Sequence, residues 1–367
     1  MAQRKQQPTK ARSQPQPRKS SSRLLWTLLV AVLSVLLAFF FGPWTKESLD
    51  STANPNEPPR PYHVVDIPGK GKGVIATRDI ARGELLYRES PLFIVPSRIS
   101  VPPAELMGKL LPTLSKSERV ALFNLSYVRL PPNLSKDDPN YDAQVALAIT
   151  QTNGIAAGTR GVGVFPNVSR MNHGCSSAFN AVYSWREKEQ KLVVYAIRPI
   201  KQGQEILTAY FDTRRPRRER REHLQEHYDF HCTCAVCSLP DDISGISDER
   251  LSRMQNMHNE LSAWAQGQIE GDEAIELINE IWWVGSLERY WSQRGRLAAD
   301  AVMVALAHSD AWAAREWADT AMTWYGYELG TDSEHVQEMK DVIESPQTQR
   351  SWGTRRRQSV GGPLKKT

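Results

Sequence analysis

Three of the four cysteines in this chain lie within six residues of one another. Cys232, Cys234 and Cys237 form the pattern C-x-C-x-x-C in the segment FHCTCAVC. A structural zinc site takes four ligands, mostly Cys thiolates and His nitrogens, so this segment supplies three and needs a fourth. Four cysteines in 367 residues are too few for a secreted disulfide scaffold. We therefore expect a metal site here rather than disulfides.

The fourth ligand cannot be fixed by spacing alone. Cys175, in the segment SRMNHGCSSAFN, is the one remaining cysteine of the sequence. If the fold brings it to the other three, a Cys₄ site uses every cysteine of the chain. The alternatives are a three-cysteine site completed by His227 or His231, or a buried Cys175 that binds no metal.

Five segments in a fixed order give the family resemblance. They are GKGVIATRDIARGELLYRESP, TNGI, RMNHGC, AIRPIKQGQEILTAYFD and YDFHCTCAVC. In this order they resemble a SET-domain protein lysine methyltransferase, and more narrowly the SET-and-MYND type and its fungal relatives without the MYND finger. The sequence has no second Cys/His array that could form that finger. The resemblance covers about residues 62–240.

The resemblance implies methyl transfer from S-adenosylmethionine to a lysine side chain of a protein substrate. It also implies that Cys175 joins Cys232, Cys234 and Cys237 around one Zn²⁺. Tyr210 matches the tyrosine beside the transferred methyl group and is the expected catalytic residue, and Tyr228 is expected to wall the lysine channel. The expected cofactor-binding residues are Gly71, Lys72, Gly73, Asn153, Asn172, His173, Tyr210 and Phe230.

Two departures from the family pattern surround Cys175. Gly174 stands where the family usually has Ser, which we expect to matter little. The loop from Cys175 to Asn180 is two residues longer than the common form, which leaves the roles of Phe179 and Asn180 open.

The elements that must position these residues fall into three kinds. Short β-like runs begin at Tyr62, helical spacing takes over at about 102–150, and residues 241–345 have helical spacing throughout. We therefore expect an α+β fold with a β-rich SET core, a helical insertion and a post-SET zinc site, together at 62–240. An all-helical, tetratricopeptide-like domain at 241–345 is expected to follow, although no clean 34-residue repeat is present.

The two ends of the chain differ from its middle in composition. Residues 24–44 carry no charge and are long enough to cross a bilayer. They predict a single-pass membrane anchor, with a cleaved signal peptide as the alternative. Residues 1–23 and 346–367 are basic and are expected to be disordered tails, and residues 45–61 are expected to be a linker. The side of the membrane that the body faces stays open, because the positive-inside rule and the reduced thiols point in opposite directions.

Charge limits the partners. The net charge is +5, but residues 240–345 hold 21 acidic against 7 basic residues. This argues against nucleic acid as the main partner and is compatible with a protein substrate that presents an accessible lysine. A catalytically silent SET-like zinc scaffold that binds other proteins is the alternative function.

Overall fold

The computed structural model describes residues 60–364, and this range contains ten short strands in four small sheets. β1 pairs with β2, β9 lies between β3 and β8, β6 lies between β4 and β5, and β7 pairs with β10 in parallel. The strands are β1 (Tyr62–Ile67), β2 (Gly71–Ala76), β3 (Leu85–Glu89), β4 (Ile94–Val95), β5 (Gly154–Ala156), β6 (Val162–Val164), β7 (Asn172–His173), β8 (Ala181–Arg186), β9 (Lys191–Ala196) and β10 (Leu207–Thr208).

A tight turn joins β1 to β2. Gly69 occupies it with φ +74°, a left-handed conformation that glycine adopts without steric cost, and the N–H of Lys70 donates to the carbonyl of Ile67 at 2.9 Å. Behind this hairpin, Val74 packs in one apolar cluster with side chains of β9 such as Val194. The β-branched residues of β9 suit a strand that is buried along most of its length.

A helical insert separates β4 from β5. It consists of α2 (Pro103–Leu110), α3 (Lys116–Phe123) and α4 (Tyr141–Asn153). These helices share an apolar cluster of their own, which includes the buried Met107. The last helix of the insert ends at Asn153 and leads directly into β5, so the insert fixes where this asparagine lies.

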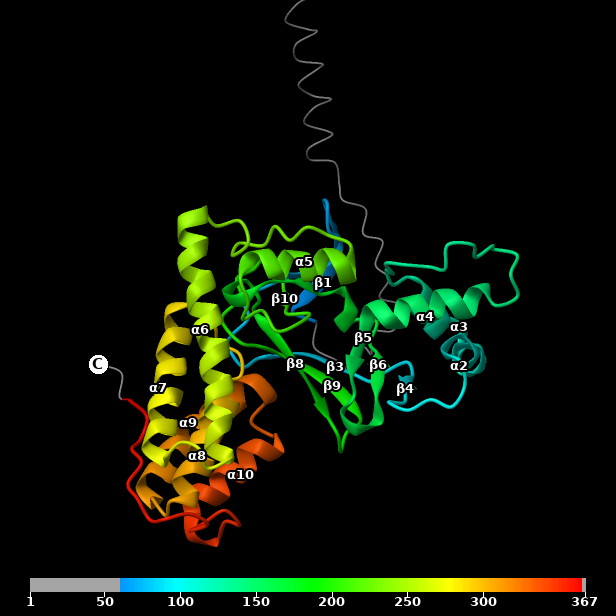
Figure 1. Ribbon diagram of the computed structural model, residues 1–367. Coiled ribbons are helices and arrows are strands. Elements are labelled where there is room, and N and C mark those ends of the chain that lie inside the picture. Colours follow the sequence, from blue (N-terminus) through cyan, green and yellow to red (C-terminus); the bar gives the residue numbers. More distant parts are fainter. Residues whose placement is uncertain (1–59, 365–367) are drawn as a thin grey trace, which may run out of the picture. The chain divides into compact units, whose positions relative to one another are not determined.

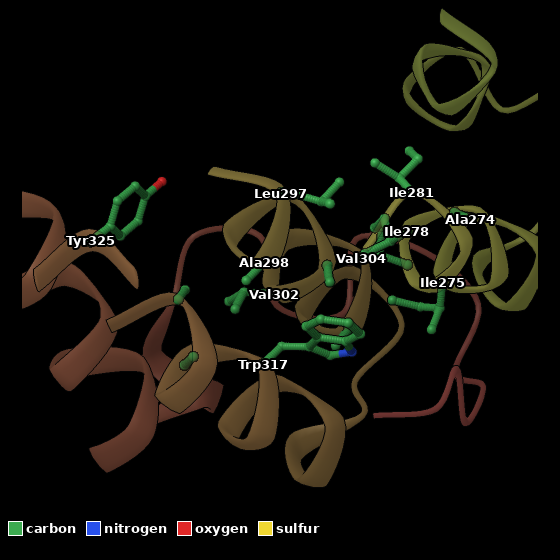
Figure 2. Packing of buried hydrophobic residues seen from close by; sticks show 14 of the residues in the cluster. Ala274, Ile275, Ile278, Ile281, Leu297, Ala298, Val302, Val304, Trp317 and Tyr325 are labelled. Carbon is green, nitrogen blue, oxygen red and sulfur yellow. The ribbon is translucent and has the colours of Figure 1, made fainter. Parts of the chain in front are cut away.

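The chain after β10 is helical. α5 (Arg217–Tyr228) precedes the cysteine-rich segment, and a group of helices follows that segment. These are α6 (Asp241–Ala265), α7 (Gly271–Leu287), α8 (Arg294–Ala307), α9 (Ala311–Leu329) and α10 (Glu334–Glu344). Their common core surrounds Trp317 of α9, which is 1 % exposed and lies near Ile275, Ile278 and Val304 in Figure 2.

Helix α9 also packs against β8 and β9 and joins the strand-rich core to the C-terminal helices. The guanidinium of Arg82, in the loop before β3, lies 5.4 to 5.5 Å from the ring centroids of Trp291, Trp324 and Tyr327. Figure 1 shows the central strands between the helical insert and the C-terminal helices. The predicted fold class, a strand-rich core with a helical insert and a helical C-terminal region, is confirmed.

The prediction of a disordered tail at 346–367 is wrong for the part that the structure describes. Residues up to 364 pack along the C-terminal helices, and Val360 is 5 % exposed. Trp317 Nε1 donates to the carbonyl of Gly361 at 3.2 Å, and the guanidinium of Arg355 lies 4.2 Å from the ring centroid of Trp264. One of the arginines that suggested a solvated tail, Arg355, thus has an aromatic partner distant in sequence, which composition does not reveal.

The membrane prediction is also corrected. Within residues 60–364, no helix is both long enough and apolar enough to cross a bilayer. The segment predicted as the anchor, residues 24–44, lies outside the described residues, as do residues 1–23 and most of the predicted linker. The described residues thus give no support to the membrane anchor, the membrane partner or the membrane localisation, and these assignments are withdrawn.

Candidate functional site

The fold brings all four cysteines into one buried cluster. The Sγ atoms of Cys175, Cys232, Cys234 and Cys237 all lie within 4.8 Å of one another, and none forms a disulfide. Two of the Sγ–Sγ distances are 3.6 Å (Cys175 to Cys237) and 4.0 Å (Cys175 to Cys232). Four thiolates about 2.3 Å from one Zn²⁺ in a tetrahedron are about 3.8 Å apart. The cluster can therefore hold a metal ion of this size.

The alternative histidine ligands lie elsewhere. His227 contacts the carbonyl of His223 on its own helix at 3.0 Å and is exposed. His231 is also exposed and does not belong to the group of candidate ligands. Of the possibilities that the sequence left open, the geometry supports the four-cysteine set.

Arg220 shows that this cluster suits a negatively charged metal centre. Its side chain is 0 % exposed and pairs with Asp248 of α6 at 3.0 Å. Within residues 60–364, its Nε and Nη2 atoms have no hydrogen-bond partner. Burial by itself lowers the pKa of Arg220, but the charges of Cys175 and Cys237 raise it above its usual value. A metal with four thiolates carries excess negative charge that these unpaired donors would compensate.

Arg221, on the same helix, holds the cysteine-rich loop in place. Its guanidinium donates to the carbonyls of Cys232 and Cys237 at 3.2 and 2.8 Å. The arginine run at the start of α5 therefore has a structural use at the cysteine cluster.

His173 connects the cysteine cluster to Tyr210. The N–H of Tyr210 donates to His173 Nδ1 at 3.1 Å, and His173 Nε2 lies 3.1 Å from Cys175 Sγ. Because Nδ1 accepts a hydrogen bond, the ring proton of the neutral imidazole is on Nε2 and faces the sulfur. Burial lowers the pKa of His173 to about 4, so the ring is neutral at pH 7.

The parallel pairing of β7 and β10 explains why these groups meet. His173 lies opposite Thr208 in this pairing. The residues that follow the two strands, Cys175 after β7 and Tyr210 after β10, therefore leave the same edge of the sheet.

A cavity of about 550 Å³ lies next to this edge, within the size range of small-molecule sites. Most of the predicted site residues line it, from strands, helices and the cysteine-rich loop. They are Lys72, Asn153, Asn172, His173, Tyr210, Tyr228 and Phe230. Gly71 and Gly73 do not line it, although the neighbouring Gly69 does. Gly73 is nonetheless close to the site, since a Cβ there would lie 2.9 Å from Asn172 Nδ2.

Polar contacts hold the walls of the cavity. Asn153 Nδ2 donates to the carbonyl of Ser126 at 2.7 Å, which ties the end of α4 to the loop after α3. Asn172 Nδ2 donates to Glu205 at 3.0 Å, and Glu205 pairs with Lys70 at 2.7 Å. The lining of the cavity is therefore partly polar, from these residues, and partly aromatic, from Phe230 and the tyrosines.

Tyr210 lies between this cavity and a second one. A cavity of about 350 Å³, lined by residues of both the strand-rich core and the C-terminal helices, shares Tyr183, Thr208 and Tyr210 with the first. The hydroxyl of Tyr210 donates to the carbonyl of Met171 at 2.9 Å, and its ring centroid lies 5.0 Å from that of Tyr228. Burial raises the pKa of Tyr210, and the electrostatic effect of Tyr228 raises it further to a smaller extent. The hydroxyl of Tyr210 therefore stays protonated at neutral pH.

The longer loop after Cys175 has a clear structural role. Phe179 is 4 % exposed and meets Tyr290, which precedes α8, edge to face with ring centroids 5.7 Å apart. Asn180 is fully buried and accepts a hydrogen bond from the N–H of Leu207 at 2.8 Å. The loop also folds back over Gly174, where a Cβ would lie 2.7 Å from the backbone nitrogen of Phe179. Glycine at this position is therefore a steric requirement and not the neutral change that we expected.

Some residues of the site were missed by sequence reasoning. Arg170, Tyr183 and Glu205 contribute to the two cavities or their walls, and Arg220 to the cysteine cluster. Arg170 is two residues before Asn172, so attention to every charged residue beside the N-H motif would have found it. No sequence pattern marks Tyr183 or Arg220, because only the packing of β8 and α5 brings these side chains to the cavities and to the cysteine cluster.

The sequence of this chain matches one protein family and several named proteins. Residues 71–211 match the SET domain. The chain is 30 % identical over 292 residues to the protein named histone-lysine N-methyltransferase set5 of Schizosaccharomyces pombe, which covers 78 % of this chain and 85 % of that protein. It is 43 % identical over 79 residues to histone-lysine N-methyltransferase ASHR1 of Arabidopsis thaliana, or 22 % of this chain and 16 % of that protein.

Shorter matches include the human proteins named SMYD3 and SMYD2. They are 33 % and 35 % identical over 81 residues, which is 22 % of this chain and 18 % of each of those proteins. The SET-domain match and the long match to set5 agree with the resemblance seen in the sequence. Together they show that this chain belongs to the SET-domain family.

Proposed function

We propose that this protein transfers a methyl group from S-adenosylmethionine to a lysine side chain of a protein substrate. The observation that carries the proposal is the position of Tyr210, which lines both cavities. A methyl donor in the larger cavity and a lysine entering from the smaller one would meet beside its ring. The names of the relatives, which call them histone-lysine N-methyltransferases, support the same reaction.

The residues of the larger cavity fit the proposed cofactor. Asn172, His173 and Phe230 would hold its adenosine part, where the amide hydrogen-bonds and the aromatic ring stacks. Asn153 and the turn that contains Lys72 would hold its methionine part. When bound, S-adenosylmethionine supplies a methyl group on a positively charged sulfonium.

The acceptor lysine must lose its proton before it attacks. With a pKa of about 10.4, deprotonation at pH 7 costs nearly 5 kcal/mol. Loss of water in a channel walled by Tyr183, Tyr210 and Tyr228, together with the positive sulfonium of the methyl donor, would lower this cost because both disfavour the ammonium. The new C–N bond forms as the C–S bond breaks, and the proton of the amine passes to solvent. The raised pKa of Tyr210 favours an orienting role for its hydroxyl over that of a general base.

We also propose that the cysteine cluster binds Zn²⁺. Its support is the geometry of the four Sγ atoms and the unpaired donors of Arg220. The metal would fix the cysteine-rich loop, which carries Phe230 just before Cys232, against the cavity.

Calorimetric titration of S-adenosylmethionine into the full chain, with zinc measured on the same sample, tests the proposal. We expect micromolar binding, one zinc per chain, and methylated lysines by mass spectrometry when a mixture of basic proteins is added. One zinc with no nucleoside binding would reject the enzyme and support the zinc scaffold.

A further inference from the structure

In the part of the chain that the structure describes, one cationic side chain of the larger cavity has no carboxylate partner. Three long cationic side chains line it, namely Lys70, Lys72 and Arg170. Lys70 pairs with Glu205 at 2.7 Å and Lys72 with Asp66 at 2.8 Å. Among residues 60–364, Arg170 has no carboxylate within ion-pair distance, and its Nη1 donates to the carbonyl of Asn124 at 3.1 Å.

The surroundings of Arg170 make this isolation costly. The side chain is half-buried, and burial lowers its pKa. A guanidinium has five N–H donors in a planar fork, which suits a carboxylate with two oxygens. The carbonyl of Asn124 uses only one of the two Nη atoms, so part of this fork remains for a ligand.

The contacts of Arg170 also show which end of the cavity it serves. Arg170 and Asn153 donate to carbonyls in the same loop after α3, those of Asn124 and Ser126. Asn153 is the residue that we assign to the methionine part of the cofactor. Arg170 and Asn153 are therefore held by the same loop, which places Arg170 beside the residue that we assign to the methionine part.

We propose that Arg170 binds the carboxylate of the methionine part of S-adenosylmethionine and gives the cavity its preference for the intact amino acid. The inference rests on the proposed function and adds a residue that determines cofactor selectivity. Charge-assisted, two-point hydrogen bonding of this kind in a half-buried site contributes about 10- to 100-fold to affinity.

A comparison of two ligands and three variants tests this inference. S-adenosylmethionine and its decarboxylated form, which lacks only the carboxylate, are titrated calorimetrically into the full chain and into Arg170→Met, Arg170→Lys and Arg129→Met. Arg129 is the control because it also donates to a single carbonyl, that of Glu226, but does not line the cavity.

We expect the wild-type chain to prefer the carboxylated ligand by about 10- to 100-fold. Arg170→Met should remove this preference and leave the affinity for the decarboxylated ligand within about twofold of the wild-type value. Arg170→Lys should retain part of the preference for the carboxylated ligand. Arg129→Met should bind both ligands as the wild type does. If Arg170→Met weakens both ligands equally, or neither, Arg170 does not bind the carboxylate. If the wild-type chain binds neither ligand, the proposed function itself fails.

Discussion

The strand-rich core and the C-terminal helices are stabilised by different kinds of contact. The helices bury a continuous apolar cluster around Trp317, made by residues that recur every three or four positions. The core has strands as short as two residues, and its site depends on side chains far apart in sequence, such as Cys175 and Cys237. The difference implies that the helices can stay folded when the site residues no longer assemble, because the site depends on a few contacts between residues far apart in sequence.

Replacing Cys175 should have the largest effect and should separate the two regions. Cys175→Ser removes one thiolate and the sulfur partner of His173. We expect metal affinity to fall by more than the roughly 10- to 100-fold that loss of an outer-shell partner costs, and binding of S-adenosylmethionine to weaken because the cysteine-rich loop carries Phe230. Metal analysis and calorimetry measure both effects, and the helical circular dichroism signal should remain near wild type.

His227→Ala provides the matched control for this experiment, because His227 is a possible ligand by sequence but lies outside the cluster. It should keep its zinc. Loss of zinc in this variant, with retention in Cys175→Ser, would contradict the four-cysteine site.

Trp317→Ala tests the opposite region. Truncation of a fully buried tryptophan costs about 3–5 kcal/mol of unfolding free energy, and Trp317 is 1 % exposed. Urea unfolding measures this loss, while zinc content should not change. Trp283, which is 56 % exposed, provides the control, and Trp283→Ala should change stability by less than about 1 kcal/mol. Equal effects of the two substitutions would mean that the core of the helices is not where we place it.

Glu328 should give the C-terminal helices a pH-dependent stability. It accepts hydrogen bonds from the N–H groups of Arg294 and Gly295 at 2.8 and 3.2 Å, and burial raises its pKa to about 7. The folded state therefore holds a proton that the unfolded chain has already lost above its ordinary pKa of 4.5. Stability should fall as pH rises from about 4.5 to about 7, by up to about 3 kcal/mol, and then level off.

Urea unfolding at pH 5 and pH 8 checks this, with Glu328→Gln as the comparison. The substituted amide still accepts from both N–H groups but does not titrate in this range. The difference between wild type and variant should follow the predicted fall, and identical pH dependence in the two proteins would show that Glu328 does not cause it.

These two regions also differ in how far the sequence predicted them. Helical spacing located the insert and the C-terminal helices because it depends on local contacts. The same reasoning could not foresee that Arg355 packs on Trp264, and so the ordered part of the tail was missed. The membrane assignment drawn from the composition of residues 24–44 has been withdrawn because it has no support in the part of the chain that the structure describes.

The candidate site was reached mainly through ordered motifs. The cysteines and most residues of the larger cavity lie together, as the family pattern implied, but Gly71 and Gly73 are outside its lining. Arg220 and Tyr183 could not be predicted, because their positions depend on how α5 and β8 pack. The roles of individual residues stay predictions until they are measured.

The most direct test of the account is the kinetics of Tyr210→Phe beside the wild type. Single-turnover methylation of a lysine substrate, with the affinity for S-adenosylmethionine measured in parallel, separates chemistry from binding. We predict that methyl transfer slows by about 10²-fold or more, because positioning of the reacting groups contributes on this scale, while the cofactor Kd changes by less than about threefold. A variant that methylates at the wild-type rate, or that loses cofactor binding and activity in equal proportion, would contradict a catalytic position for Tyr210 between the two cavities.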